Sequence, residues 1–287
     1  MDPKKAANYV KARNKTLPEY QFGNFHVLVQ APLPEDIDIS KVFKNVNGLL
    51  PAHFLNLIDV VYVGDFQFLN DREINAMYSD GAIYLSNVQD NNDDLKDDIV
   101  HELAHAVEEK YGQFLYSDEK IKNEFLQKRS RLKKILENQG YNISNLDFLE
   151  TEYNEEFDSF LYKEVGYDAL ILLTVDLFTA AYSATSLREY LARGFEEYYL
   201  GNRLYLKDLC PYIYRKLSLL DEEDQYVPPA GYKLGACLDM HKMIDNTEDL
   251  ACEVTWHFEL ILQRKAAPRR NNTKTKITPD RAPKREE

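Results

Sequence analysis

Short runs of β-branched and aromatic residues, bounded by turn-forming residues, mark the first third of the chain as strand-forming. These runs predict strands at residues 25–29, 58–63, 74–78 and 82–86. The last two runs flank Asp80-Gly81, a pair that is typical of a β-hairpin turn. Between the first two runs, residues 39–57 have a helical pattern that Pro51 interrupts.

After residue 93, apolar residues recur with the period of an α-helix. The first of these helices has one apolar stripe, made by Leu95, Ile99, Leu103 and Val107. Asp93 or Asp94 is expected to cap this helix, and Gly112 to end it near residue 111. Further helices are predicted at residues 117–138, 151–180, 186–200 and 204–220. Strands followed by helices indicate an α+β fold with a small mixed sheet near the N-terminus and a mostly helical second half.

A length of 287 residues suits one large domain with appendages. The polar start of the chain predicts a flexible segment, and the composition changes again after residue 222. The expected parts are a flexible segment at 1–20, a main domain at 21–222, a small helical appendage at 223–263 and a basic disordered tail at 264–287.

The formal net charge of −13 argues against a nucleic-acid-binding protein, because an acidic surface repels phosphates. The charge is not uniform: residues 264–287 hold nine basic and three acidic residues, a net +6, which leaves −19 for the chain before them. We therefore expect nucleic acid to bind at most weakly, through the tail. The acidic body favours basic peptides as partners.

The sequence also carries signals about compartment. Its three cysteines form no disulfide framework, which favours a reducing compartment. Residues 1–15 lack the apolar core of a signal peptide. The most apolar stretch, residues 165–181, contains Asp168 and Asp176 and is too short to span a bilayer. The expectation is a protein without membrane contact, in the cytoplasm or delivered to the cytoplasm of a host.

The strongest chemical signal is the run His101-Glu102-Leu103-Ala104-His105, an H-E-x-x-H motif on the first long helix. The two histidines lie on one helical face, so both imidazoles can bind one metal ion. Zn²⁺ accepts neutral imidazole nitrogens and keeps a position open for water. Glu102 can reach that water without being a ligand, which predicts it as the general base.

A catalytic zinc site needs a third protein ligand. A metzincin would place a third His at Tyr111, so that class is excluded. Asn123-Glu124 lies about where thermolysin-like enzymes place an Asn-Glu pair. Their supporting Asp, however, would fall at Lys128, which has the wrong charge.

Residues 182–195 resemble a motif of the anthrax lethal factor family of zinc peptidases. That family places a Tyr seven residues before its glutamate ligand, and two large apolar residues, Ala, any residue, a small residue and Phe follow the ligand. The matching positions are Tyr182, Glu189, Tyr190, Leu191, Ala192, Gly194 and Phe195. The resemblance covers about residues 22–220. It implies a zincin-like catalytic domain in which Glu189 is the third ligand of one Zn²⁺ and the Tyr182 hydroxyl stabilises the transition state.

This chain departs from the family pattern in two ways. The family has an acidic residue four positions after the ligand, where this chain has Arg193. Either Glu196 or Glu197 replaces it beside the zinc histidines, or zinc is held more weakly. The long segment between the motifs predicts an insertion at about 117–165 that forms a lid or a substrate-selecting element.

One alternative for Glu189 needs no metal. Ser186-Leu187-Arg188-Glu189 also has the pattern of a capping box, in which the Glu189 carboxylate would only bind the N-terminus of its own helix.

In zinc peptidases of this architecture an edge strand pairs with the substrate backbone, and Ile83, Tyr84 and Leu85 are the expected substrate-binding residues. The sequence therefore predicts a zinc-dependent endopeptidase that acts on protein or peptide substrates, with Glu102 as general base. Arg193 motivates the alternative, a zincin-like protein that binds peptides or partners without cleaving them.

Overall fold

The computed structural model describes residues 18–22 and 25–222. The expected helical appendage and basic tail lie outside the described residues, as does most of the expected flexible N-terminal segment. The end of that segment differs from the expectation, because Glu19 and Tyr20 belong to a strand.

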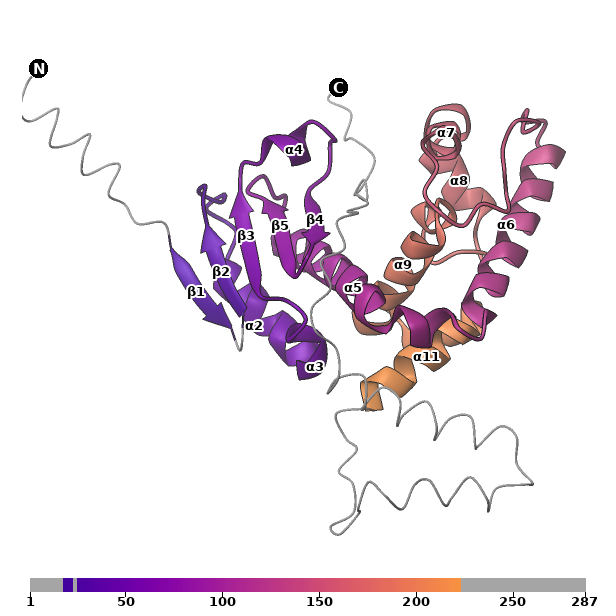
Figure 1. The fold of residues 1–287 in the computed structure, drawn as a ribbon. Helices are drawn as coiled ribbons and strands as arrows, with labels where there is room; N and C mark the ends of the chain where they lie inside the picture. The colour runs from indigo at the N-terminus through magenta and orange to yellow at the C-terminus, as the bar shows by residue number, and fades with distance from the viewer. Residues whose placement is uncertain (1–17, 23–24, 223–287) are drawn as a thin grey trace, which may run out of the picture.

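The first part of the chain forms one five-stranded mixed sheet with the order β1-β2-β3-β5-β4 (Figure 1). β2, β3 and β5 are parallel to one another, and the edge strands β1 and β4 are antiparallel to their neighbours. The strands are β1 (Glu19–Phe22), β2 (Phe25–Val29), β3 (Val60–Gly64), β4 (Ala76–Ser79) and β5 (Ala82–Ser86). The predicted α+β class with a small mixed sheet is confirmed, and β1 is the strand that the sequence pattern missed.

The predicted hairpin joins β4 to β5 through Asp80 and Gly81. Both residues have positive φ angles, 47° and 81°, as a tight hairpin turn requires. A side chain at Gly81 would also meet the Asp59 carboxylate at 3.1 Å. The Asp-Gly pair thus fixes the register of β4 against β5, and with it the place of β4 at the sheet edge.

Helix α5 (Asn92–Tyr116) lies between the sheet and the helices that follow it in the chain (Figure 1). Both predicted ends of this helix were wrong. Asn91 is the N-cap, and its side chain accepts hydrogen bonds from the backbone of Asp93 and Asp94. The helix also continues through Gly112, because Phe114 and Leu115 are buried in the core beyond it and tertiary packing outweighs the low helix propensity of glycine.

The second half of the chain is helical, as predicted, but more broken. The helix expected over residues 151–180 is in fact three short helices, since Gly166 has a φ of 81° that ends the π-helical turn before it. Pro211 divides the helix expected over 204–220. Within the described residues, the helices besides α5 are α2 (Ile39–Leu49), α3 (Ala52–Leu55), α4 (Gln67–Asn70), α6 (Lys120–Asn138), α7 (Glu155–Ser159), η1 (Phe160–Val165), α8 (Tyr167–Leu173), η2 (Ala181–Ala184), α9 (Leu187–Tyr199), α10 (Arg203–Leu209) and α11 (Pro211–Glu222).

One hydrophobic core runs through both halves, and α5 contributes to it on more than one side. Residues of its apolar stripe are buried, and so are Val100, Ala104 and Ala106 on its other faces. This helix is therefore buried on more faces than the single apolar stripe accounts for. None of the described helices combines the length and the apolar character needed to cross a membrane.

Two helical glycines give a test of this packing. A Cβ at Gly194 would lie 2.8 Å from Ile213 Cγ2, whereas a Cβ at Gly112 would meet no atom within 4 Å. We expect Gly194→Ala to lower the free energy of unfolding by about 1–2 kcal/mol through overpacking. Gly112→Ala should raise it by about 0.5–1 kcal/mol, because alanine favours helix. Urea denaturation of both variants measures the two changes, and a destabilised Gly112→Ala protein would contradict the uninterrupted α5.

Candidate metal centre

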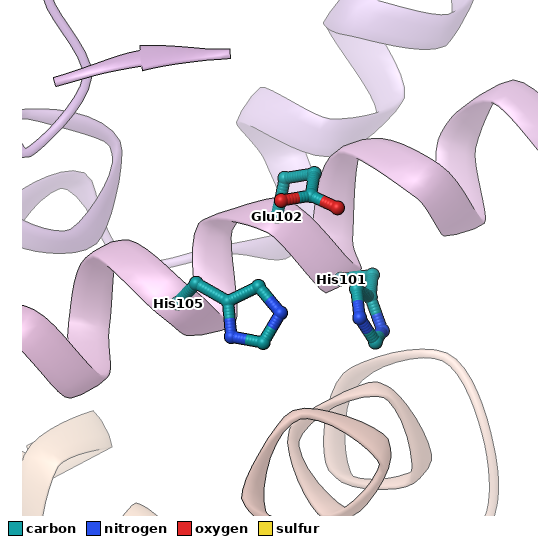
Figure 2. Close-up of side chains that lie close together, drawn as sticks. All are labelled: His101, Glu102 and His105. Atoms are coloured by element: carbon teal, nitrogen blue, oxygen red, sulfur yellow. The ribbon is translucent and has the colours of Figure 1, made fainter. Parts of the chain in front are cut away.

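Helix α5 carries both histidines of the motif on one side. His101 and His105 are one turn apart, their ring centroids lie 4.8 Å from each other, and their ring planes are nearly perpendicular. Both side chains are almost completely buried, with 1% and 2% exposure. Figure 2 shows the two imidazoles on the same side of the helix. The i, i+4 spacing therefore places both imidazoles on one face of the helix, as the sequence predicted.

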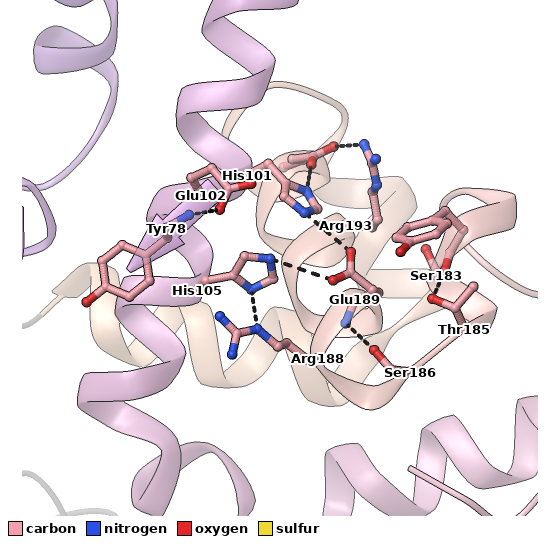
Figure 3. Close-up of polar contacts among 12 residues, drawn as sticks. Tyr78, His101, Glu102, His105, Ser183, Thr185, Ser186, Arg188, Glu189 and Arg193 are labelled. Atoms are coloured by element: carbon pink, nitrogen blue, oxygen red, sulfur yellow. Dashed lines mark hydrogen bonds and ion pairs between the residues drawn. The ribbon is translucent and has the colours of Figure 1, made fainter. Parts of the chain in front are cut away.

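Glu102 completes a buried group that could hold a metal ion. One ligand atom from each of His101, Glu102 and His105 lies within 4.8 Å of the others. Glu102 is fixed from the sheet side, since its Oε2 accepts a 2.5 Å hydrogen bond from the backbone N–H of Tyr78 on β4 (Figure 3). This bond, which uses Oε2, ties the carboxylate to the sheet edge.

Glu189 faces the two histidines from the first turn of α9 (Figure 3). Its carboxylate oxygens lie 3.3 Å from His101 Nε2 and 3.7 Å from His105 Nε2. The side chain is 1% exposed. The structure thus brings together three residues that the sequence analysis expected at one metal ion, across 84 positions of chain between His105 and Glu189.

The capping-box alternative holds only in part. Ser186 is the N-cap of α9, and its hydroxyl accepts a 3.1 Å hydrogen bond from the backbone N–H of Glu189. The Glu189 carboxylate, however, makes no hydrogen bond to the helix N-terminus or to any other described group. Its side chain is directed to the histidines, and the capping function belongs to Ser186 alone.

The donor atoms fit a small divalent cation. Ligand bonds of 2.0–2.2 Å in a tetrahedral site place neighbouring donor atoms about 3.4 Å apart. The distances from Glu189 to the two Nε2 atoms lie on either side of that value. A buried carboxylate without hydrogen bonds is costly unless a cation compensates its charge. The Glu189 carboxylate is such a group, because neither of its oxygens has a hydrogen-bond partner among the described residues. His105 Nε2, beside it, has none either.

Glu196 connects His101 to Arg193. One of its carboxylate oxygens contacts His101 Nδ1, and the other accepts a 2.8 Å hydrogen bond from Arg193 Nη1. A carboxylate on Nδ1 holds the proton there, so Nε2 carries the lone pair that can bind a metal. Of the two glutamates expected beside the histidines, Glu196 is the one that contacts His101. Glu197 instead accepts a hydrogen bond from the backbone of Asn202.

The second histidine has a different partner. His105 Nδ1 accepts a 3.0 Å hydrogen bond from Arg188 Nε. Burial and the Arg188 charge hold the pKa of His105 well below its usual range, so the ring is neutral. A neutral ring that accepts at Nδ1 carries its proton on Nε2. Metal binding through Nε2 therefore requires Nδ1–H, and Glu108 Oε2 is the acceptor within reach, 4.0 Å from Nδ1 and 3.6 Å from Arg188 Nε.

Tyr182 lies in η2, directly before the N-cap of α9. Its hydroxyl oxygen is buried and has no hydrogen-bond partner among the described residues. Burial, and then the charge of Glu189, raise the pKa of Tyr182 far above its ordinary value. The hydroxyl therefore stays protonated and can donate one hydrogen bond.

The substrate-binding prediction for Ile83, Tyr84 and Leu85 placed the edge of the sheet at the wrong strand. β5 pairs with β3 on one side and with β4 on the other, so its backbone is not available to a peptide. β4 is the edge strand, and it is also the strand that contacts Glu102. The sequence pattern located the hairpin correctly but contained no signal for which of its strands lies outside.

Glu124, the thermolysin-like alternative, belongs to another buried network. Its carboxylate accepts hydrogen bonds from the Tyr190 hydroxyl at 2.7 Å and from the Tyr212 backbone at 3.3 Å. Burial raises the pKa of Glu124. Lys128, whose charge argued against this alternative, donates to the backbone carbonyls of Leu177 and Leu209.

Three residues around the histidines were not anticipated. Arg188 and the backbone of Tyr78 reach the site from α9 and β4, and no spacing in the sequence indicates these contacts. Glu108 could have been found, because it lies three residues after His105 on the same helix and such residues are neighbours on a helix surface.

No protein-family model, curated protein or solved structure matches this chain. The functional argument therefore depends on the residues and their geometry.

The ligand assignment predicts opposite results for two glutamates. Glu189→Gln should weaken Zn²⁺ binding by more than about 100-fold, beyond the 10–100-fold typical of losing an outer partner, because a charged donor is removed. Glu124→Gln should bind Zn²⁺ like the wild type. Competition with a chromophoric chelator measures both affinities. Loss of binding in Glu124→Gln together with normal binding in Glu189→Gln would reverse the assignment.

Glu196 gives a second test. Glu196→Ala should weaken Zn²⁺ binding by about 10- to 100-fold, because His101 loses the carboxylate that orients it. Glu197→Ala is the matched control from the next position and should leave the affinity unchanged. The same chelator competition measures both, and equal affinities in the two variants would remove Glu196 from the site.

Proposed function

We propose that this protein is a zinc-dependent endopeptidase with a zincin-like catalytic domain similar to that of the anthrax lethal factor family. One observation carries the proposal: the Glu189 carboxylate lies buried between two imidazole Nε2 atoms without any hydrogen bond of its own, and Glu102 lies beside them. Two His and one Glu are a ligand set typical of catalytic zinc. The same set would be unusual for a purely structural site, which zinc closes with four protein ligands.

Zinc bound by His101, His105 and Glu189 would supply a water of lowered pKa and polarise the carbonyl of the scissile bond. The remaining chemistry is that of the chain's own side chains. Glu102 takes the proton of the attacking water and later passes it to the leaving amine. The Tyr78 backbone N–H holds the carboxylate in place through Oε2, so Oε1 is the oxygen assigned to the proton.

Tyr182 is assigned to the developing negative charge on the carbonyl oxygen. A buried hydroxyl without a partner is a preorganised donor, and such donors are most effective where charge appears in the transition state. The raised pKa of Tyr182 supports this function, because the proton stays on the hydroxyl at every physiological pH.

β4 is the strand that we assign to the substrate backbone, in place of β5. It is the edge of the sheet on the side of α5, and one of its backbone groups already binds Glu102. An extended peptide that pairs with a sheet edge is held by main-chain hydrogen bonds, whatever its side chains. This mode places a peptide bond beside the general base.

A second candidate is a zincin-like module that binds peptides without cleaving them. The hydrogen bond from Arg188 to His105 Nδ1 favours it, because this bond selects the ring tautomer that does not bind metal through Nε2. Arg193, which motivated this candidate in the sequence, no longer favours it, because Glu196 pairs with the guanidinium and neutralises its charge. Binding of peptides from a broad library together with the absence of turnover, whatever the zinc content, would identify this second candidate.

The catalytic proposal predicts separate effects on binding and on chemistry. Glu102→Ala should retain Zn²⁺ and lose about 10²- to 10⁴-fold in kcat for peptide hydrolysis, because the proton acceptor is removed while the ligands stay. Mass spectrometry of a proteome digest incubated with each protein detects cleavage, and elemental analysis detects the metal. Wild-type activity in Glu102→Ala would end the proposal.

A further inference from the structure

The two histidines of the candidate centre are held by the same types of side chain, but in opposite order. His101 Nδ1 contacts the carboxylate of Glu196, and Arg193 donates to the other oxygen of that carboxylate at 2.8 Å. At His105 the arginine comes first, because Arg188 Nε donates directly to Nδ1 at 3.0 Å (Figure 3). The partner of His101 Nδ1 is therefore an acceptor, and the partner of His105 Nδ1 is a donor.

This order decides which ring nitrogen is able to hold a metal. A carboxylate on Nδ1 keeps the proton there, so the lone pair of His101 lies on Nε2. An N–H donor on Nδ1 needs the lone pair at that atom, so the neutral ring of His105 has its proton on Nε2. This Nε2 lies 3.7 Å from a carboxylate oxygen of Glu189. An N–H that faces the buried carboxylate lowers the cost of its charge, but it also closes His105 to a metal ion.

A carboxylate that suits His105 Nδ1 lies next to Arg188. Glu108 Oε2 is 4.0 Å from His105 Nδ1 and 3.6 Å from Arg188 Nε. The other oxygen, Oε1, accepts a 2.7 Å hydrogen bond from the Tyr116 hydroxyl. Glu108 and Tyr116 both belong to α5, the helix that carries His105. The acceptor is thus held beside the ring by its own helix, roughly 1 Å farther away than a hydrogen bond requires.

Arg188 is the member of this group with the most freedom to move. Its side chain is 28% exposed, whereas that of Glu108 is 16% exposed and that of His105 is 2% exposed. A long side chain with access to water exchanges one polar partner for another at little cost. The buried ring has no such alternative, so a change of partner at Nδ1 requires that Arg188 withdraws.

We propose that Arg188 and Glu108 exchange places on His105 and thereby set the metal affinity of the centre. In one arrangement Arg188 donates to Nδ1 and the proton is on Nε2. In the other, Arg188 has withdrawn, Nδ1–H donates to Glu108 and Nε2 is a ligand. The exchange removes a proton from Nε2 to water and adds one from water at Nδ1, so the ring stays neutral.

The inference rests on the zinc site of the proposed function and adds regulation to it. Breaking the bond between Arg188 and His105 is part of the cost of binding a cation, so the centre binds Zn²⁺ less tightly than its three ligands alone would. The metal content of the protein then follows the zinc supply. At His101 no such exchange is needed, because Glu196 already contacts Nδ1.

Two variants of the full-length protein should change the affinity in opposite directions. Arg188→Met removes the competing donor and should strengthen Zn²⁺ binding about 10- to 100-fold, the effect of one hydrogen bond from a charged group. Glu108→Ala removes the acceptor and should weaken binding about 10- to 100-fold. Competition with a chromophoric chelator measures both. Unchanged or weaker binding in Arg188→Met would overturn the proposal, and unchanged binding in Glu108→Ala would remove Glu108 from it.

Loss of a positive charge near the centre strengthens zinc binding by itself, so a second measurement follows the ring protons. NMR with isotope-labelled histidine distinguishes Nδ1–H from Nε2–H. In the metal-free wild type, His105 should be protonated on Nε2, and it should change to Nδ1–H on addition of Zn²⁺ and in metal-free Arg188→Met. His101 is the internal control, with Nδ1–H throughout. Nδ1–H on His105 in the metal-free wild type, or Nε2–H in Arg188→Met, would overturn the exchange.

These measurements need no turnover, so they separate failure of the exchange from failure of the peptidase proposal. The change of ring proton together with tighter binding in Arg188→Met supports the exchange, even if the wild type cleaves no peptide. Peptide cleavage without these two results retains the peptidase and rejects the exchange. A protein that binds no Zn²⁺ in any form rejects both.

Discussion

The packing of α9 against α5 is the interaction on which the rest of the structure depends. It places the Glu189 carboxylate against His101 and His105 in a space with almost no solvent. Burying a carboxylate away from water costs several kcal/mol unless a cation compensates its charge. Apolar packing around α9 offsets part of this cost; the Phe195 ring of α9, for example, packs against Phe54 of α3.

A buried arginine holds the segment before α9 in place. Arg129 on α6 is almost fully buried and donates to the backbone carbonyls of Ala184 and Thr185, and to Asp147 on the far side. Its guanidinium lies 3.8 Å from the centre of the Phe157 ring. These contacts fix the short path from Tyr182 to the Ser186 N-cap, so the helix that carries Glu189 begins where the tyrosine hydroxyl is buried. Tyr182 in this segment also lines an apolar pocket of about 530 Å³.

Much of the candidate site could be predicted because its residues lie close together in sequence or follow a fixed spacing. His101 and His105 are one helical turn apart, and that spacing alone decides that they share a face. Glu196 was one of two expected replacements for the acidic residue that Arg193 displaces, since it lies about two turns after Glu189 on the same helix. Arg188 on His105 was not predicted, because the contact depends on how two helices approach and not on any local pattern. The edge position of β4 was missed for the same reason.

The sequence by itself determined the local features of this protein: the strand and hairpin signals, the long buried helix, the paired imidazoles on it and the N-cap that starts α9. These depend on backbone propensity, on helical periodicity and on turn chemistry, which act over a few residues. Only the tertiary structure decided that Glu189 rather than Glu124 meets the histidines and that β4 lies outside β5. It also decided that Gly112 does not end α5 and that Gly166 separates η1 from α8. Such outcomes depend on which apolar faces pack together, and that choice is made by the whole core at once.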